Sequence, residues 1–138
     1  ELEFARSKNE RIRASYLPHN FEPVEQAGLW SLVEGVAEVT AGVRLLPTPG
    51  HTPFHCSVTV ESDGEIACFL ADVCPTTAHL PLPWIMGYDL EPLVTLESKR
   101  GLWKRALEGD WLLIFEHDPR IPWGRLDPDS DKYALRDD

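Results

Sequence analysis

The segment 48–55, Thr-Pro-Gly-His-Thr-Pro-Phe-His, prevents regular secondary structure in the middle of the chain. Its two prolines fix their φ angles and lack an N–H donor, and its glycine admits backbone conformations that other residues resist. Apolar or alternating stretches on either side predict strands at 43–46 and 56–60. We therefore expect a stiff loop between two strands that holds His51 and His55 in place.

Two later apolar runs also end in side chains that can bind metal. The run 65–71 is followed directly by Asp72, and the run 111–115 is followed by Glu-His-Asp at 116–118. Continuous apolar runs of this length are typical of strands that are covered on both faces. A histidine loop, an aspartate and a second histidine at strand ends together predict a site for divalent metal ions.

These three motifs, in this order, resemble the second half of metallo-β-lactamase-fold hydrolases, in particular the branch of acyl-homoserine lactonases and related metal-dependent hydrolases. The resemblance covers residues 13–126. It implies that His51 completes the three-histidine site of one metal ion. It further implies that Asp72 bridges two ions, as a catalytic residue, and that His117 binds the second ion. Phe54 stands where the family often has glycine.

The same resemblance gives two further residues supporting roles. His55 occupies the position of the family's second histidine in this loop, which usually supports the site without binding metal. Metal-bound histidines commonly donate their other N–H to a carboxylate, and Asp118 or Glu116 is a candidate acceptor. We therefore expect His55 and Asp118 beside the metal ligands, in contact with them but not with the ions.

Two divalent ions are the implied cofactor, with zinc expected and iron or manganese as alternatives. Such a pair supplies hydroxide at neutral pH and polarises a carbonyl, which suits hydrolysis of a small ester, lactone, thioester or amide. The family's first-half motif, His-x-His-x-Asp-His, is absent from this sequence. We therefore expect the chain to be the C-terminal half of such a fold, inactive and poor in metal by itself.

A second interpretation gives the chain no catalytic role. A half-domain would expose a large apolar face, through which it would associate with its missing half or with a second copy. Serine or cysteine hydrolysis is disfavoured, because the sequence contains no Gly-x-Ser-x-Gly motif. Metal binding and the partner that supplies further histidines distinguish the first two interpretations.

The predicted fold class is α/β (α+β): half of an αββα sandwich, with mixed or antiparallel strands and flanking helices. We expect one domain over 1–138, with a linking segment at 1–20 and an acidic, solvated tail at 127–138. The clearest helix spans 92–108, with an apolar stripe of Leu96, Trp103 and Leu107 and a solvated basic face of Lys99, Arg100, Lys104 and Arg105. A marginal helix is expected within 1–14, and a short one at 21–27 opened by Pro23.

The proline-rich segment 74–83 predicts a loop that crosses a cleft after Asp72. His79 within it, and Trp84 and Tyr88 after it, are candidates for a substrate pocket. The alternatives are a histidine bonded to the backbone and aromatic rings packed against a neighbouring helix.

Composition limits the partners and the compartment. A net charge of −10 argues against nucleic acid and against an anionic membrane, because both attract basic surfaces. The three cysteines, Cys56, Cys68 and Cys74, lie in or beside apolar strands and form no Cys-x-x-Cys motif. We expect buried free thiols in a reducing compartment, the cytoplasm.

Overall fold

The computed structural model describes residues 1–7 and 9–136, which contacts divide into two compact units, Glu1–Glu34 and Gly35–Asp138. Two aspartates of the predicted acidic tail, Asp137 and Asp138, lie outside the described residues. No helix in the described part of the chain has the length and apolar character needed to cross a membrane.

The first unit contains two short helices, α1 (Leu2–Ala5) and α2 (Pro18–Gln26). The helix predicted within 1–14 is thus limited to one turn. The prediction that Pro23 opens the second helix is wrong, because Pro18 occupies the first turn and Pro23 lies inside the helix. A proline in the first turn costs no hydrogen bond, since the N–H groups there have no partner within the helix.

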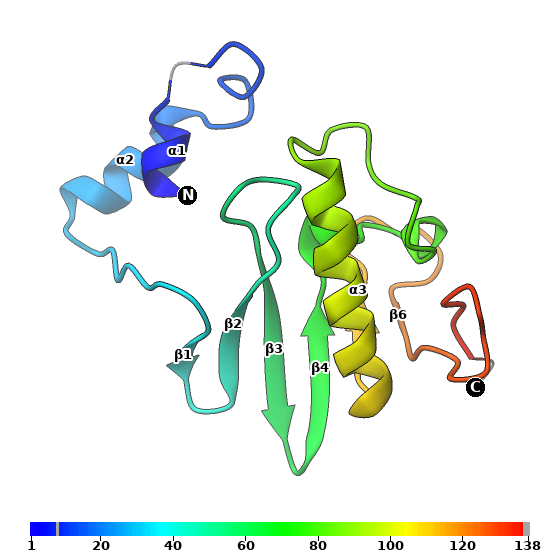
Figure 1. The fold of residues 1–138 in the computed structure, drawn as a ribbon. Coiled ribbons are helices and arrows are strands. Elements are labelled where there is room, and N and C mark those ends of the chain that lie inside the picture. Colours follow the sequence, from blue (N-terminus) through cyan, green and yellow to red (C-terminus); the bar gives the residue numbers. More distant parts are fainter. Residues whose placement is uncertain (8, 137–138) are drawn as a thin grey trace. The chain divides into compact units, whose positions relative to one another are not determined.

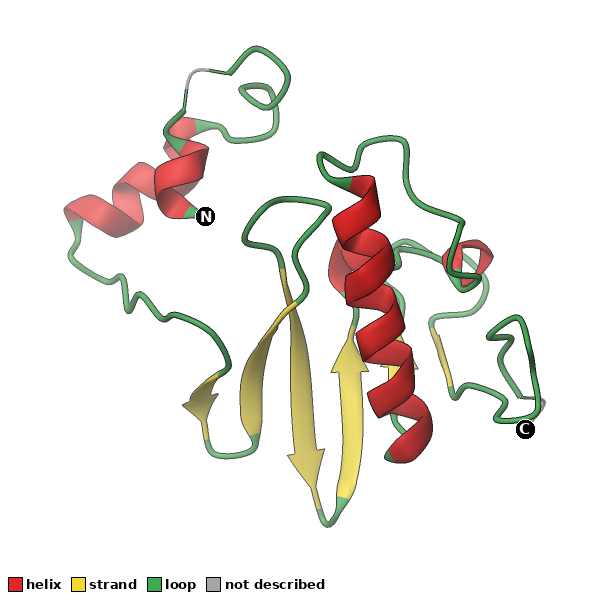
Figure 2. Ribbon diagram, in the orientation of Figure 1, coloured by secondary structure: helices red, strands yellow, loops and turns green. Residues whose placement is uncertain are grey.

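The second unit is a mixed six-stranded sheet with strands in sequence order (Figures 1 and 2). The strands are β1 (Ala37–Thr40), β2 (Val43–Pro47), β3 (Cys56–Ser62), β4 (Glu65–Phe69), β5 (Leu112–Ile114) and β6 (Trp123–Gly124). Neighbours pair antiparallel except β4 and β5, which are parallel and connected through helix α3 (Pro92–Glu108). The predicted mixed α/β architecture is confirmed.

Strand direction explains why the three sequence motifs meet. β3 is antiparallel to both β2 and β4, and β4 is parallel to β5, so β2, β4 and β5 all run the same way. The segments that follow these three strands therefore leave the same edge of the sheet. They are the loop 48–55, the 3₁₀ turn η1 (Ala71–Val73) and the segment 115–118.

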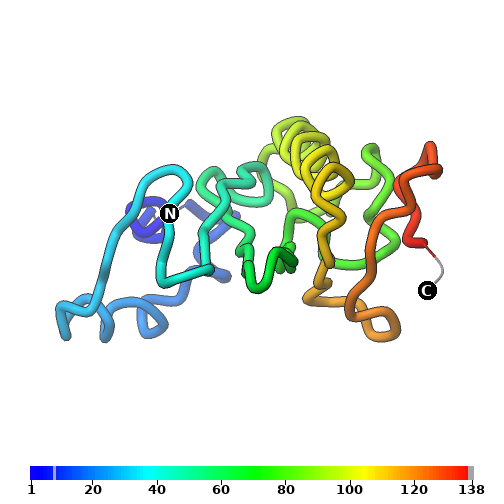
Figure 3. The backbone as a smooth tube through the Cα atoms, turned by 90° about the horizontal axis from the view of Figure 1, so that it is seen from below, coloured from blue at the N-terminus to red at the C-terminus, as the bar shows by residue number. Residues whose placement is uncertain are grey.

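Helix α3 packs on one face of the sheet (Figure 3). Side chains of β2, β4 and β5 that share this face, Leu46, Cys68 and Leu113, are buried in one core with Trp103 of the helix. The predicted apolar stripe is only partly correct. The buried residues of α3 are Thr95, Lys99, Leu102, Trp103 and Ala106.

The prediction that Lys99 lies on the solvated face of α3 is therefore wrong. Lys99 has an exposed fraction of 0%. It lies three residues after Leu96 and four before Trp103, which is the spacing of a helix face that points into a core.

The opposite face of the sheet is apolar over most of its width. Residues directly opposite one another on paired strands share a face. The ladder therefore places on this face Val43, Leu45, Val58, Val60, Ala67, Phe69, Leu112, Ile114 and Trp123. All are intermediate or exposed, with Val60 at 46% and Trp123 at 62%. Within the second unit, this face keeps substantial apolar surface in contact with water.

Candidate metal centre

Three of the predicted site residues converge at the sheet edge. Asp72 lies in η1, directly after Ala71, whose φ of 50° is unusual for a residue other than glycine. Its Oδ2 lies 3.6 Å from Nε2 of His51, and its Oδ1 lies 3.4 Å from Nε2 of His117. The two oxygens of one carboxylate thus face two different histidines.

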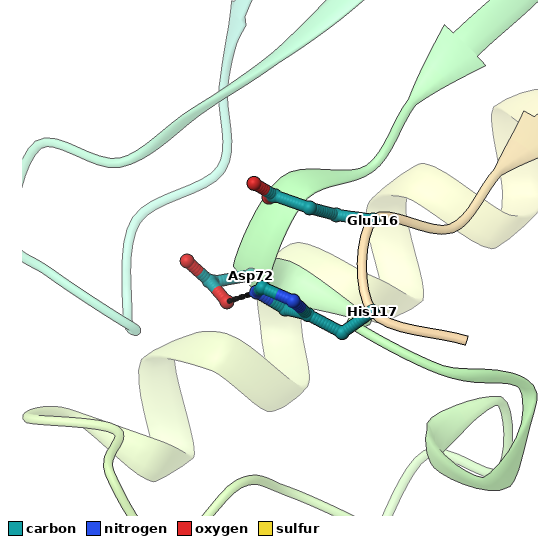
Figure 4. Close-up of side chains that lie close together, drawn as sticks. All are labelled: Asp72, Glu116 and His117. Atoms are coloured by element: carbon teal, nitrogen blue, oxygen red, sulfur yellow. Dashed lines mark ion pairs between the residues drawn. The ribbon is translucent and has the colours of Figure 1, made fainter. Parts of the chain in front are cut away.

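Glu116 brings a second carboxylate to the same place. Ligand atoms of Asp72, Glu116 and His117 all lie within 4.8 Å of one another. Figure 4 shows the side chains of Asp72 and His117 directed toward each other, with Glu116 extending from the segment that also carries His117. Glu116 and His117 are exposed, so this side of the site is open to solvent.

The distances suit metal binding. Two donors about 2.0–2.2 Å from one tetrahedral ion lie roughly 3.3–3.6 Å apart. The pairs His51–Asp72 and His117–Asp72, at 3.6 and 3.4 Å, both match this separation. Imidazole nitrogens and carboxylate oxygens are also the donors that zinc, iron and manganese accept. The residues present therefore fit two divalent ions that share Asp72.

The loop that carries His51 is anchored to the start of α3. The N–H groups of Leu90 and Glu91 donate to the carbonyls of His51 and Gly50, at 3.1 and 2.9 Å. Gly50 has a φ of 134°, and a Cβ there would lie 2.3 Å from the backbone nitrogen of Thr95. Only glycine can approach the helix this closely. This contact, together with the two hydrogen bonds, fixes the position of His51 beside the ends of the strands.

Asp89 holds the ring of His51, and the sequence analysis did not identify it. Nδ1–H of His51 donates to Oδ1 of Asp89 at 3.0 Å, and the Thr95 hydroxyl donates to Oδ2 at 2.5 Å. The Asp89 side chain is 1% exposed. The hydrogen bond fixes the proton on Nδ1 and leaves the Nε2 lone pair directed toward Asp72. No sequence pattern points to Asp89, because its partners His51 and Thr95 become its neighbours only in the fold.

His55 is held by hydrogen bonds at both ring nitrogens. Nδ1–H donates to the carbonyl of Thr48 at 3.0 Å, and Nε2 accepts the backbone N–H of Asp72 at 3.2 Å. The Thr48 hydroxyl lies 3.0 Å from that of Ser57, which donates to the carbonyl of Leu70 at 3.0 Å. These hydrogen bonds connect the histidine loop with the backbone at Leu70 and at Asp72.

Asp118 connects the His117 segment with the segment after Asp72. Its carboxylate accepts hydrogen bonds from the N–H and hydroxyl of Thr77, at 2.9 and 2.7 Å, and from the N–H groups of Arg120 and Ile121. These donors, led by the Thr77 hydroxyl, hold the pKa of Asp118 well below its usual range. Within the described part of the chain, Asp118 therefore bonds to Thr77 and to backbone N–H groups and not to a histidine ring.

The three candidate pocket residues are placed differently from one another. Trp84, 62% exposed, lines a cavity of about 790 Å³ with Thr77, Ala78, Pro81, Leu82, Pro83, Asp131, Lys132 and Tyr133. His79 and Tyr88 do not line this cavity. Tyr88 is 80% exposed, and Nδ1 of His79 lies 2.8 Å from the hydroxyl of Thr76.

The three cysteines are free thiols, with Cys68 and Cys74 buried and Cys56 partly buried. Burial raises the pKa of Cys74 to about 12, and its thiol contacts the carbonyl of Thr76 at 3.5 Å. Among the described residues, Cys74 is not part of the group of close metal-binding side chains, Asp72, Glu116 and His117.

No family model matches the chain. The chain is 38% identical over 122 residues to the N-acyl homoserine lactonase AiiA of Bacillus thuringiensis subsp. kurstaki, which covers 86% of the chain and 44% of that protein. A probable metal-dependent hydrolase from Staphylococcus aureus superimposes with a TM-score of 0.86 at 25% identity, over 100% of the chain and 50% of its own length.

A second solved structure shows the same fold at lower identity. AidC, a dizinc quorum-quenching lactonase in complex with a product, has a TM-score of 0.69 at 15% identity over 95% of the chain and 48% of its own length. In each comparison the chain spans about half the length of the protein that it matches.

Proposed function

We propose that the chain carries part of the dimetal centre of a hydrolase, because it is similar to N-acyl homoserine lactonases and shares the fold of AbOPH, a hydrolase of the beta-lactamase superfamily. In this proposal His51 binds one ion, His117 binds the other, and Asp72 bridges them. The observation that carries the proposal is the Asp72 carboxylate, whose two oxygens face the Nε2 atoms of two different histidines.

The chain's own residues supply orientation and charge to this centre. When bound, the two ions would supply hydroxide near neutral pH and polarise the substrate carbonyl. Asp72 contributes a negative charge that offsets the repulsion between two cations. Asp89 accepts a hydrogen bond from Nδ1 of His51 and so orients the ring with Nε2 toward Asp72, and His55 fixes the backbone of Asp72 by accepting the Asp72 N–H. Asp118 supports the site indirectly, by holding the His117 segment against Thr77.

The proposed substrate is a small lactone, with esters and thioesters as related alternatives. The lactone is preferred because the curated relatives are named N-acyl homoserine lactonases. Zinc is the proposed metal, since it suits a donor set of imidazole and carboxylate and AidC is described as a dizinc lactonase. We also propose a cytoplasmic location, which two buried free cysteines support.

Three ligands shared between two ions are fewer than the usual four at each zinc. We therefore propose that further ligands come from the rest of a longer protein, since the curated relatives are about twice the length of the chain that they match. The 138-residue chain by itself is then inactive and weakly metallated.

The test compares the 138-residue chain with the full-length protein by native mass, metal content and hydrolysis of acyl homoserine lactones. We expect the full-length protein to hold about two metal ions and to lose activity on chelation, with recovery on adding zinc. The chain by itself should hold far less than one ion. A full-length protein that hydrolyses lactones equally well without metal would contradict the proposal.

A second candidate function is association without catalysis, favoured by the apolar sheet face opposite α3. Val60 and Trp123 on that face are 46% and 62% exposed. Apolar surface of this kind commonly marks a protein interface. The native mass distinguishes the candidates: a stable dimer of the chain, with no lactonase activity in the full-length protein, would favour association.

Asp89→Asn should weaken metal binding. The amide keeps the size of the carboxylate but loses its charge, and so it holds the His51 proton on Nδ1 less firmly. Removing such a partner typically costs about 10–100-fold in metal affinity. We expect this loss in a zinc titration of the full-length protein with a competing chelator. Glu91→Gln, a matched change two residues away at an exposed position, should leave affinity within about twofold. Equal effects of the two variants would contradict the role of Asp89.

A further inference from the structure

Lys99 is enclosed by backbone carbonyl groups. Its Nζ donates to the carbonyls of His79, Pro81 and Trp84, at 2.5, 2.9 and 3.0 Å, with a longer contact of 3.4 Å to Leu82. An ammonium group has three N–H donors. The three short bonds therefore use all of them, and the side chain is fully buried, at 0% exposure.

A buried lysine is costly and needs a physical reason. Lysine is almost never fully buried without a partner, because its charge loses its hydration. Burial here lowers the pKa of Lys99. The carbonyl groups offset this cost, since they direct the negative ends of their dipoles at the ammonium. The carbonyl groups are stabilised as well, because they lie outside any strand or long helix and need hydrogen-bond donors.

The carbonyls all belong to one segment, 79–84, which is also held to α3 by Trp103. The Trp103 ring N–H donates to the carbonyl of Leu80 at 2.9 Å. Two buried side chains of helix α3, Lys99 and Trp103, thus hold the segment by hydrogen bonds. Pro81, Leu82 and Trp84, whose carbonyls Lys99 binds, also line the 790 Å³ cavity.

The same segment lies between two contacts of the candidate metal centre. On its N-terminal side, Thr77 is held by Asp118, next to His117. On its C-terminal side, Asp89 holds the ring of His51. Any shift of the segment would therefore move the cavity wall relative to both histidines.

We propose that Lys99 is a positioning residue that holds segment 79–84 as one wall of the cavity and thereby sets how the apolar part of a substrate is bound. The proposal rests on the proposed hydrolase function. In it, the cavity receives the acyl group of the substrate, because its wall is largely apolar, with Pro81, Leu82, Pro83 and Trp84. Lys99 itself touches backbone and stays outside the reaction.

The test is Lys99→Met in the full-length protein, with Lys104→Met as the matched control. Methionine keeps the length of the side chain and removes its three donors. Lys104 lies on the same helix with its side chain 74% exposed, so its replacement removes the same charge without a buried contact. Hydrogen exchange of the amides in 79–84 should become at least about tenfold faster in Lys99→Met and stay unchanged in Lys104→Met.

Kinetics then separate positioning from general stability. We expect the KM of Lys99→Met for long-chain acyl lactones to rise about tenfold while kcat changes less than about threefold, since binding and not the reacting groups is affected. Metal content should stay at the wild-type value. A fall in kcat as large as the rise in KM, with the same size for short and long acyl chains, would overturn the proposal.

Lys99→Arg covers the case in which the methionine variant fails to fold. Arginine keeps the charge and the donors, and so it should restore slow exchange of 79–84 at least in part. Slow exchange of 79–84 in a folded Lys99→Met protein would overturn the positioning role. Absence of lactone and ester hydrolysis by the wild-type full-length protein would instead refute the proposed function. The positioning role would then still be tested, because hydrogen exchange is measured without substrate.

Discussion

Asp72→Asn is expected to reduce lactone hydrolysis by the full-length protein at least about 1,000-fold, which corresponds to roughly 4 kcal/mol of transition-state stabilisation. The two oxygens of the Asp72 side chain lie 3.6 and 3.4 Å from Nε2 of His51 and of His117. An amide offers one weaker oxygen ligand and no charge, so two cations would no longer be held together. Steady-state kinetics and metal analysis on the same sample measure both effects.

Glu116→Gln is the matched control for this prediction. It removes one negative charge from the same cluster, whose ligand atoms lie within 4.8 Å of one another. We expect activity within about tenfold of wild type, because an exposed carboxylate contributes little through charge alone. Full activity of Asp72→Asn would refute the metal assignment. Equal losses in both variants would show that Glu116 shares in binding the ion at His117.

Gly50→Ala is expected to destabilise the full-length protein by about 3 kcal/mol or more. The added Cβ would lie 2.3 Å from the backbone nitrogen and hydroxyl oxygen of Thr95, and the φ of 134° is unfavourable for alanine. The histidine loop would then have to move away from α3 and from Asp89, which holds the ring of His51 just before that helix. Urea denaturation gives the change in stability, and zinc titration shows whether His51 has moved.

Gly64→Ala separates backbone strain from the steric clash. Gly64 also has a positive φ, of 81°, but a Cβ there would meet no atom within 4 Å. Its replacement should therefore cost only the conformational strain, about 1–2 kcal/mol, and leave metal binding unchanged. If both alanine variants lost the same stability, close contact with Thr95 would not be what requires glycine at position 50.

Much of the sheet could be predicted, because its signals are local. The stiff loop 48–55 and the apolar runs before Asp72 and His117 fixed the approximate positions of β2 to β5. The three motifs at strand ends predicted one metal site, and the family resemblance assigned a role to each residue, although no local pattern reveals that β2, β4 and β5 run the same way. The structure places Nε2 of His51 and of His117 within 3.6 and 3.4 Å of the Asp72 carboxylate, and their roles as metal ligands stay a prediction.

Asp89 and Lys99 could not be identified with the same reasoning, because each is defined by what it contacts. A residue's charge predicts exposure on average, and the carbonyl groups that offset burial of Lys99 lie 15–20 residues away in the chain. The helical spacing did contain a signal, since Lys99 falls on the same face as Trp103. That signal was outweighed by the usual exposure of lysine.

The way in which Lys99 holds its segment has a consequence for how such a protein can evolve. Every residue has a backbone carbonyl group, so the hydrogen bonds from Lys99 to 79–84 do not depend on which side chains the segment carries. Leu82, Pro83 and Trp84 can then be exchanged to reshape the cavity while the backbone stays in place. Substrate range becomes open to mutation at these positions, separately from the metal-binding chemistry proposed for His51, Asp72 and His117.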